Sequence, residues 1–96
     1  MQLSDIPFMF QSRLRIAAVA ALISSPRDFT SLLAITKSTP GNLGKQLELL
    51  EKEGYITSSK SIVNRRPNTA YTLTPAGREA FTEYVRMLER VIDEVN

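Results

Sequence analysis

The chain has 96 residues, of which 43% are hydrophobic, and its 12 Lys and Arg stand against 10 Asp and Glu, a formal net charge of +2. This composition predicts one folded domain with a modest core rather than a disordered chain. Cysteine and histidine are both absent, which excludes disulfides, thiolate chemistry, zinc sites made of these ligands and catalytic triads that use histidine. We therefore expect no metal, no cofactor and no enzymatic activity.

The N-terminal segment, residues 1–12, is an apolar leader. Asp5 and Pro7 interrupt it, no positive region precedes it, and no apolar run in the chain approaches about 18 residues. Neither a secretion signal nor a membrane span is predicted, and the expected location is the cytoplasm. A helix is predicted next, over residues 13–24, and it is apolar on most sides, so we expect it to be buried on more than one face.

Two short helices are predicted to follow, separated by a tight turn at residues 36–38. Asp28 is a good N-cap for the first, and Thr39 with Pro40 is a cap followed by proline at the first helical position. Leu43, Leu47 and Leu50 give the second helix, residues 39–53, one apolar face. This arrangement is the helix-turn-helix pattern.

The opposite face of the helix over 39–53 is polar and suits a nucleic-acid duplex. Asn42 can pair with adenine, Lys45 can reach guanine acceptors or a phosphate, and Gln46 lies nearer the core edge. Gly41 allows close approach, and Thr39 with the free N–H groups suits a phosphate oxygen. Acidic residues farther along would repel phosphates, so only the first two turns should enter a groove. A solvated amphipathic helix is the alternative.

A basic hairpin is predicted after Gly54, with strands at 55–63 and 69–73 and a turn at 64–68. Between residues 55 and 78 there are four basic residues and no acid. This segregation favours an anionic partner over a merely solvated tip. Arg65 and Arg66 could straddle the backbone or enter a narrow minor groove. The further candidate contacts on the hairpin are Lys60, Asn68 and Thr69.

The last helix, from Thr74-Pro75 to about Val95, carries an apolar stripe along its whole length. At 1.5 Å per residue it would be roughly 30 Å long, about the diameter of the domain, so the body cannot cover the stripe. We expect a second copy to pack on the stripe across a two-fold axis. The alternative is that the stripe is buried in the core of a single chain. The predicted interface, with part of the leader, is Ile6, Phe8, Phe10, Phe81, Tyr84, Val85, Leu88, Val91, Ile92 and Val95.

The order of these elements over about residues 13–92 resembles the winged-helix transcriptional regulators of the MarR/ArsR-like class, most closely their small stand-alone subfamily. The matching segments are 28–30, 41–43 with Leu47 and 50–51, 54–56, 65–67 and 71–78. The resemblance implies a mainly α fold with a small β-hairpin (α+β), a winged helix-turn-helix with a long C-terminal dimerisation helix. Residues 1–96 then form a single domain, with a leader at 1–12, the helix-turn-helix and wing at 13–73, and the dimerisation helix at 74–96.

The resemblance also implies a function: a homodimer that binds a pseudo-palindromic operator in double-stranded DNA, with the helix over 39–53 in the major groove and the wing over 63–69 beside it. The turn departs from the family pattern, since it lacks the usual glycine, and this adds Lys37 as a possible phosphate contact. The full set of predicted DNA contacts is Lys37, Ser38, Thr39, Gly41, Asn42, Lys45, Gln46, Lys60, Arg65, Arg66, Asn68 and Thr69.

A winged-helix module that binds protein rather than DNA is the alternative function. The acids Glu48, Glu51 and Glu53 favour it, as does Leu49, which is predicted to face outward where this class usually has a polar residue. The sequence assigns no small-molecule effector, no operator sequence and no sign of regulation.

Overall fold

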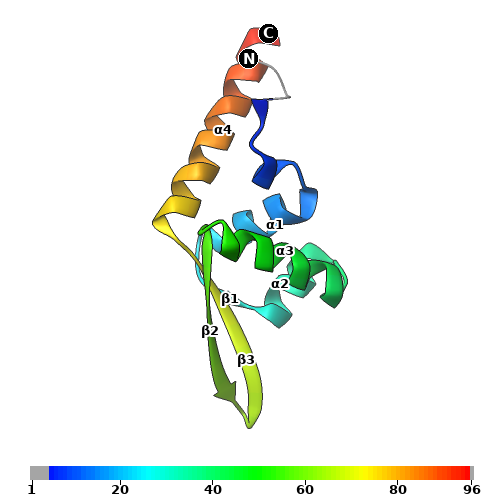
Figure 1. The fold of residues 1–96 in the computed structure, drawn as a ribbon. Coiled ribbons are helices and arrows are strands. Elements are labelled where there is room, and N and C mark those ends of the chain that lie inside the picture. Colours follow the sequence, from blue (N-terminus) through cyan, green and yellow to red (C-terminus); the bar gives the residue numbers. More distant parts are fainter. Residues whose placement is uncertain (1–4, 96) are drawn as a thin grey trace.

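The computed structural model describes residues 5–95, so the first four residues of the predicted leader and Asn96 lie outside the described part (Figure 1). Helices and a small sheet follow one another along the chain. Their bounds are η2 Phe8–Phe10, α1 Arg13–Leu22, β1 Arg27–Asp28, α2 Phe29–Thr36, α3 Pro40–Lys52, β2 Ile56–Val63, β3 Arg66–Leu73 and α4 Pro75–Val95. The predicted mainly α fold with a small β-hairpin (α+β) and a long last helix is confirmed.

The helix starts are set by side chains that cap free backbone N–H groups. Ser12 accepts from the Arg15 N–H at the start of α1, and Asp28 accepts from the Ser31 N–H at 2.8 Å at the start of α2. The predicted helix over 13–24 ends earlier, at Leu22.

The sheet is antiparallel with strand order β1-β3-β2, and β2 and β3 form a hairpin from Ile56↔Leu73 to Val63↔Arg66. The predicted five-residue turn at 64–68 is wrong, because only Asn64 and Arg65 form the turn and β3 begins at Arg66. Pro67 is tolerated inside β3 because, within residues 5–95, no strand pairs with the edge of β3 that faces away from β2 at this position. The strand β1 pairs with that edge only at Tyr71 and Ala70, so the missing N–H of Pro67 costs no hydrogen bond there. The short strand β1, which the sequence analysis did not predict, pairs Arg27 with Tyr71 and Asp28 with Ala70.

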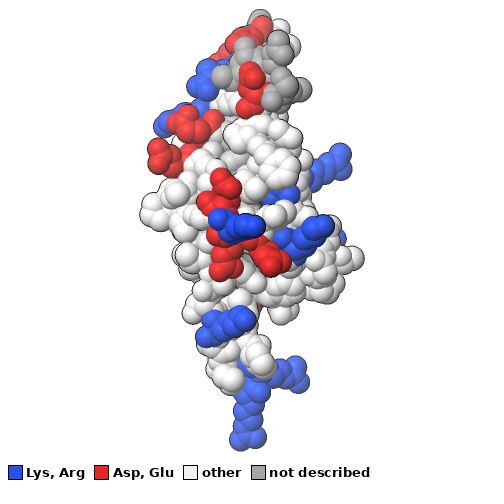
Figure 2. All heavy atoms as spheres, in the orientation of Figure 1, with Lys and Arg blue, Asp and Glu red and all other residues white. Residues whose placement is uncertain are grey.

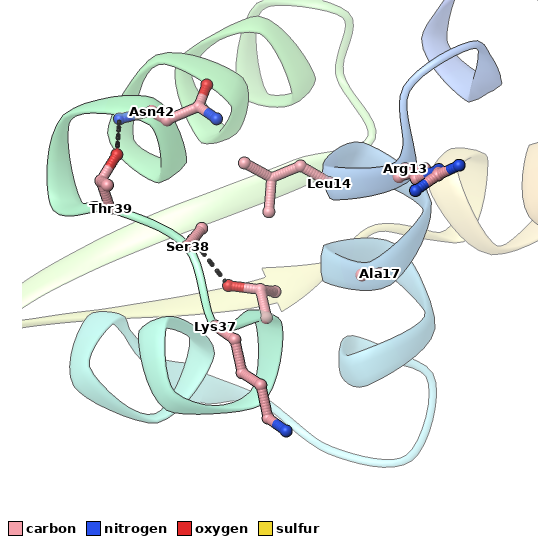
Figure 3. A pocket seen from close by; sticks show the side chains of 8 residues that line it. Arg13, Leu14, Ala17, Lys37, Ser38, Thr39 and Asn42 are labelled. Carbon is pink, nitrogen blue, oxygen red and sulfur yellow. Dashed lines mark hydrogen bonds between the residues drawn. The ribbon is translucent and has the colours of Figure 1, made fainter.

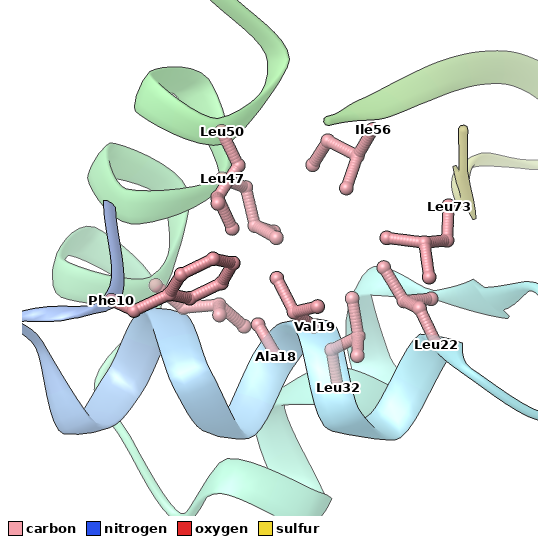
Figure 4. Packing of buried hydrophobic residues seen from close by; sticks show 10 residues of the cluster. Phe10, Ala18, Val19, Leu22, Leu32, Leu47, Leu50, Ile56 and Leu73 are labelled. Atoms are coloured by element: carbon pink, nitrogen blue, oxygen red, sulfur yellow. The ribbon is translucent and has the colours of Figure 1, made fainter. Parts of the chain in front are cut away.

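The core lies where α1, α2 and α3 meet the base of the hairpin (Figure 4). The predicted inner face of α3, Leu43, Leu47 and Leu50, is buried there. The other buried members of this cluster are Phe10, Ala18, Val19, Leu22, Leu32, Ile56 and Leu73.

Phe10 was predicted to lie at a dimer seam, but the structure corrects this assignment. Its side chain is only 2% exposed within the single chain. Its ring stacks on Tyr55 and Tyr84, with centroids 5.9 and 5.0 Å away, and meets Phe81 edge-on at 5.8 Å. The leader therefore joins the base of the hairpin to α4, and Phe10 has no surface left to offer a second copy.

The helix α4 runs away from the body at one end of the molecule, and the hairpin projects at the other (Figure 1), which gives overall extents of 54 × 25 × 21 Å. A tight junction fixes the start of α4. Thr74 donates its N–H to the Tyr55 carbonyl at 3.0 Å, and Gly77 lies so close to that carbonyl that a Cβ there would overlap it. Among residues 5–95, no helix is long and apolar enough to cross a membrane.

Candidate nucleic-acid interface

The N-terminal end of α3 presents a polar, solvent-exposed surface. Thr39 caps the helix by accepting from the Asn42 N–H at 3.3 Å, with Pro40 at the first helical position, as predicted. Gly41, Asn42 and Lys45 are all exposed. This end of α3 therefore combines free N–H groups with a cation and an amide, the groups that suit phosphates and base edges.

A hollow of about 410 Å³ lies beside this helix end, between α1 and the turn that precedes α3 (Figure 3). Arg13, Lys37 and Asn42 contribute to its lining, together with the half-buried Ser38. The Ser38 hydroxyl is held by the Thr36 hydroxyl at 2.8 Å. Arg13 was not among the predicted contacts. Its signal in the sequence was that Arg13 and Arg15 are the only charged residues in an otherwise apolar helix.

Lys37, the centre of the turn, has a left-handed backbone with φ of +53°. This explains how the helix-turn-helix closes without its usual glycine: the αL position is present, but a lysine occupies it at a conformational cost. Lys37 also accounts for the sharp end of α2, because its N–H donates to the Leu33 carbonyl at 3.0 Å.

We expect Lys37→Gly to raise the free energy of unfolding by about 0.5–1 kcal/mol, because glycine removes an αL cost of roughly 1–2 kcal/mol and loses part of the gain through its freer unfolded chain. Lys37→Ala removes the same charge but keeps the backbone cost, so it should not stabilise the protein. Chemical denaturation of both variants measures the difference. Equal stabilities would contradict the assigned backbone strain.

The hairpin turn has positive φ at both central residues, +51° at Asn64 and +64° at Arg65, as in a type I′ turn. Asparagine adopts this conformation readily, whereas the second position ordinarily carries glycine. Arg65 is thus held in a strained backbone at the tip, the kind of cost that accompanies a functional constraint.

The predicted wing residues fall on two faces of the hairpin. Lys60 lies opposite Thr69 on one face, and Asn68 and Arg66 lie on the other, because successive strand residues alternate. Lys60 and both arginines are exposed, while the two polar residues are half-buried. The wing therefore presents cations on both faces and at its tip.

Charge is distributed unevenly over the molecule. Figure 2 shows Lys and Arg side chains at the far end of the hairpin, with acidic side chains gathered above it and along α4. At the base of the hairpin, Ser58 donates to the Glu51 carboxylate at 2.9 Å. Arg78, counted among the hairpin cations, donates to the Ile23 carbonyl at 2.8 Å and so caps the end of α1 instead. Within the hairpin, the positive charge available to an anion is thus concentrated toward the tip.

Two tyrosines near the base of the hairpin remain neutral at physiological pH. Burial, reinforced by the charge of Glu53, raises the pKa of Tyr55 above its ordinary value of 10.0, and burial with Glu51 does the same to the pKa of Tyr71. Neither side chain adds negative charge to the surface.

Gln46 is half-buried, in agreement with its predicted place near the core edge, and it is held by other side chains. It accepts a hydrogen bond from the buried Arg15 at 2.6 Å and donates one to Asn42 at 3.3 Å. Leu49, predicted to face outward, is also half-buried. Within residues 5–95, no cluster of three or more acidic side chains is placed to hold a metal ion.

Comparison with known proteins identifies this arrangement. A family model described as a winged helix DNA-binding domain matches residues 14–92. The chain belongs to the winged helix DNA-binding domain family. In this family's terms α2 and α3 are the helix-turn-helix, with α3 as its second helix, and the β2–β3 hairpin is the wing.

Transcriptional regulators are among the matches. The chain is 42% identical over 57 residues to transcriptional regulator Rv3488 of Mycobacterium tuberculosis, covering 59% of this chain and 53% of that protein. It is thus aligned with about half of the length of that relative.

Solved structures of other proteins share the fold. Bacillus subtilis PadR in complex with operator DNA superposes with a TM-score of 0.67 at 19% identity, covering 73% of this chain and 46% of that chain. A MarR-family regulator from Silicibacter pomeroyi gives 0.65 at 21% identity, covering 88% and 56%. The predicted winged-helix family is confirmed, and the resemblance to MarR-like regulators is confirmed at the level of the fold.

Proposed function

We propose that this protein is a homodimeric transcriptional regulator that binds double-stranded DNA sequence-specifically at a pseudo-palindromic operator. The observation that carries the proposal is the pairing of an exposed polar helix start on α3 with a cationic wing tip in a winged-helix fold. The operator-bound PadR neighbour supports DNA as the partner.

In this proposal the first two turns of α3 enter the major groove. Asn42 and Lys45 contact base edges, while Thr39 and the free N–H groups lie against a phosphate. Lys37 and Ser38, which precede the helix, reach the adjoining backbone, and Gly41 allows close approach. The acidic second half of α3 stays outside the groove because its charges would repel phosphates.

The wing contacts the backbone or the adjoining minor groove. Arg65 at the tip and Arg66 beside it supply the main cations, and Lys60 adds one on the opposite face. Narrow minor grooves attract arginine because their negative potential is enhanced. Asn68 and Thr69 donate to phosphates from the same strand.

A second copy packs against α4. Val85, Leu88, Ile92 and Val95 follow one another at spacings of three, four and three residues, the pattern of a helix that pairs with another helix. Val85, Ile92 and Val95 are exposed in the single chain, whereas Met87 on the side toward the leader is buried. Two-fold pairing would bury this stripe and place two copies of α3 side by side along DNA.

Selection of binding sites from random duplexes, followed by sequencing, tests the function directly. We expect two related half-sites in inverted orientation, with centres about one helical turn apart or a multiple of it. Failure to retard any duplex at low salt would overturn the proposal and favour a protein-interaction module.

The wing's role is measured by the salt dependence of binding. Arg65→Ala with Arg66→Ala should lower the slope of log affinity against log salt by about 1.8, roughly 0.9 for each phosphate contact removed. Arg65→Ala keeps a Cβ in the same strained backbone, so the change isolates the charge.

The matched control is Arg86→Ala with Arg90→Ala, which removes the same net charge from exposed positions on α4. Its slope should stay close to that of the natural protein. If the two double variants have equal slopes, the wing arginines act only through the net charge of the protein. The proposed contacts of Arg65 and Arg66 with phosphates would then be wrong.

A further inference from the structure

A chain of hydrogen bonds runs from the core to the exposed face of α3. Arg15, only 6% exposed, donates from its Nη1 atom to Gln46 Oε1 at 2.6 Å. Gln46 Nε2 in turn donates to Asn42 Oδ1 at 3.3 Å. Two further donors of Arg15 bind the leader, Nε to the Met9 carbonyl at 2.9 Å and Nη2 to the Phe8 carbonyl at 3.0 Å. The guanidinium is therefore fixed from three sides.

This series of hydrogen bonds has only one favourable arrangement of donors and acceptors. A guanidinium has donors and no acceptor, so Gln46 must turn its oxygen toward Arg15. Its amide nitrogen then faces Asn42, and Asn42 must present its oxygen to that nitrogen. Reversing either amide would set donor against donor or acceptor against acceptor. The buried arginine thus determines which end of the Asn42 amide is engaged inside the protein and which is free.

We propose that Arg15 and Gln46 are positioning residues that set the base preference of Asn42, an inference that rests on the proposed function. With Oδ1 engaged by Gln46, Asn42 offers its Nδ2 donors to the groove, next to the ammonium of the exposed Lys45. Guanine presents two acceptors, N7 and O6, in the major groove, whereas bidentate pairing with adenine also needs the Asn oxygen, which is turned toward Gln46 and already uses one of its two lone pairs there. The base that Asn42 contacts is guanine, not the adenine expected from the sequence.

Gln46→Glu tests the direction of the chain. A carboxylate still accepts from Arg15 but has no donor for Asn42. Asn42 then turns its nitrogen toward Glu at position 46 and its oxygen toward the groove. The preferred base becomes one with an exocyclic amine in the major groove, adenine or cytosine.

The measurement is the relative affinity for four duplexes that differ at a single base pair, the one at which Asn42→Ala loses discrimination. We expect the natural protein to favour guanine there by roughly tenfold, and Gln46→Glu to favour adenine or cytosine. Ratios among the four duplexes cancel any uniform repulsion by the new carboxylate. Gly44→Glu adds the same charge on α3, at a position with open space around its Cβ, and should keep the guanine preference.

A folded Gln46→Glu variant that keeps the guanine preference would overturn the inference while leaving DNA binding intact. So would an Asn42→Ala variant that loses discrimination at no base pair. If circular dichroism shows that Gln46→Glu does not fold, Gln46→Met replaces it as the test, because it lacks the amide that forms both hydrogen bonds. Gln46→Met should reduce the guanine preference to about twofold or less. An undiminished guanine preference in this variant would also overturn the inference. A natural protein that binds no duplex removes both this inference and the proposed function.

Discussion

Phe10→Ala should lower the free energy of unfolding by about 3–5 kcal/mol, the usual cost of deleting a buried phenylalanine. The ring is almost fully buried and contacts Tyr55, Phe81 and Tyr84, so its removal leaves a cavity where the leader, the hairpin base and α4 meet. The total free energy of unfolding of a domain of this size is about 5–15 kcal/mol, so this loss is a large part of it. Chemical denaturation, analysed with a fixed m-value, measures the loss.

Phe8→Ala is the matched control, two residues away in the same 3₁₀ segment. Phe8 is 64% exposed, and its ring lies 4.9 Å from the Arg15 guanidinium carbon, so we expect a loss of about 1 kcal/mol or less. The Phe10→Ala loss should also be independent of protein concentration, because the contacts lie within one chain. A loss that disappears on dilution would return Phe10 to an interface between copies.

The helices of this fold were predictable because each begins with a local signal. Asp28 and Thr39 cap their helices through their own side chains, and Pro40 stands where a missing N–H costs nothing. The inner face of α3 followed from leucine spacing alone. Such signals depend on residues within one turn of each other, so sequence is sufficient to detect them.

Features that depend on distant residues were missed or misplaced. The two-residue hairpin turn requires positive φ at Arg65, a conformation for which arginine gives no signal. Phe10 looked like surface filler, because its aromatic partners are 45 to 74 residues away along the chain. Arg15 was hidden for the same reason, since its side-chain partner Gln46 lies on another helix. The outline of the candidate interface was predictable, but the contacts that orient it were not.

Val85→Glu with Ile92→Glu should convert the proposed dimer to a monomer and weaken binding to a two-half-site operator by about 10²–10⁴-fold, the avidity that linking two sites supplies. Both side chains are exposed in the single chain, 36% and 58%, so the substitutions leave its core intact. In the dimer they would place like charges across the two-fold axis in an apolar seam. Sedimentation should then give the mass of one 10.7 kDa chain, and affinity for a single half-site should change little.

Arg86→Glu provides the matched control, because it changes the net charge by the same two units on another face of α4. Its one cost in the structure is the exposed ion pair with Glu83 at 2.9 Å, which contributes little. This variant should stay dimeric and keep most of its operator affinity. If both variants lose affinity equally while remaining dimeric, net charge rather than pairing governs binding; a natural protein that is monomeric at micromolar concentration contradicts the α4 interface outright. If operator affinity falls in Val85→Glu with Ile92→Glu but not in Arg86→Glu, then pairing through the apolar stripe sets the spacing of the two α3 helices along DNA.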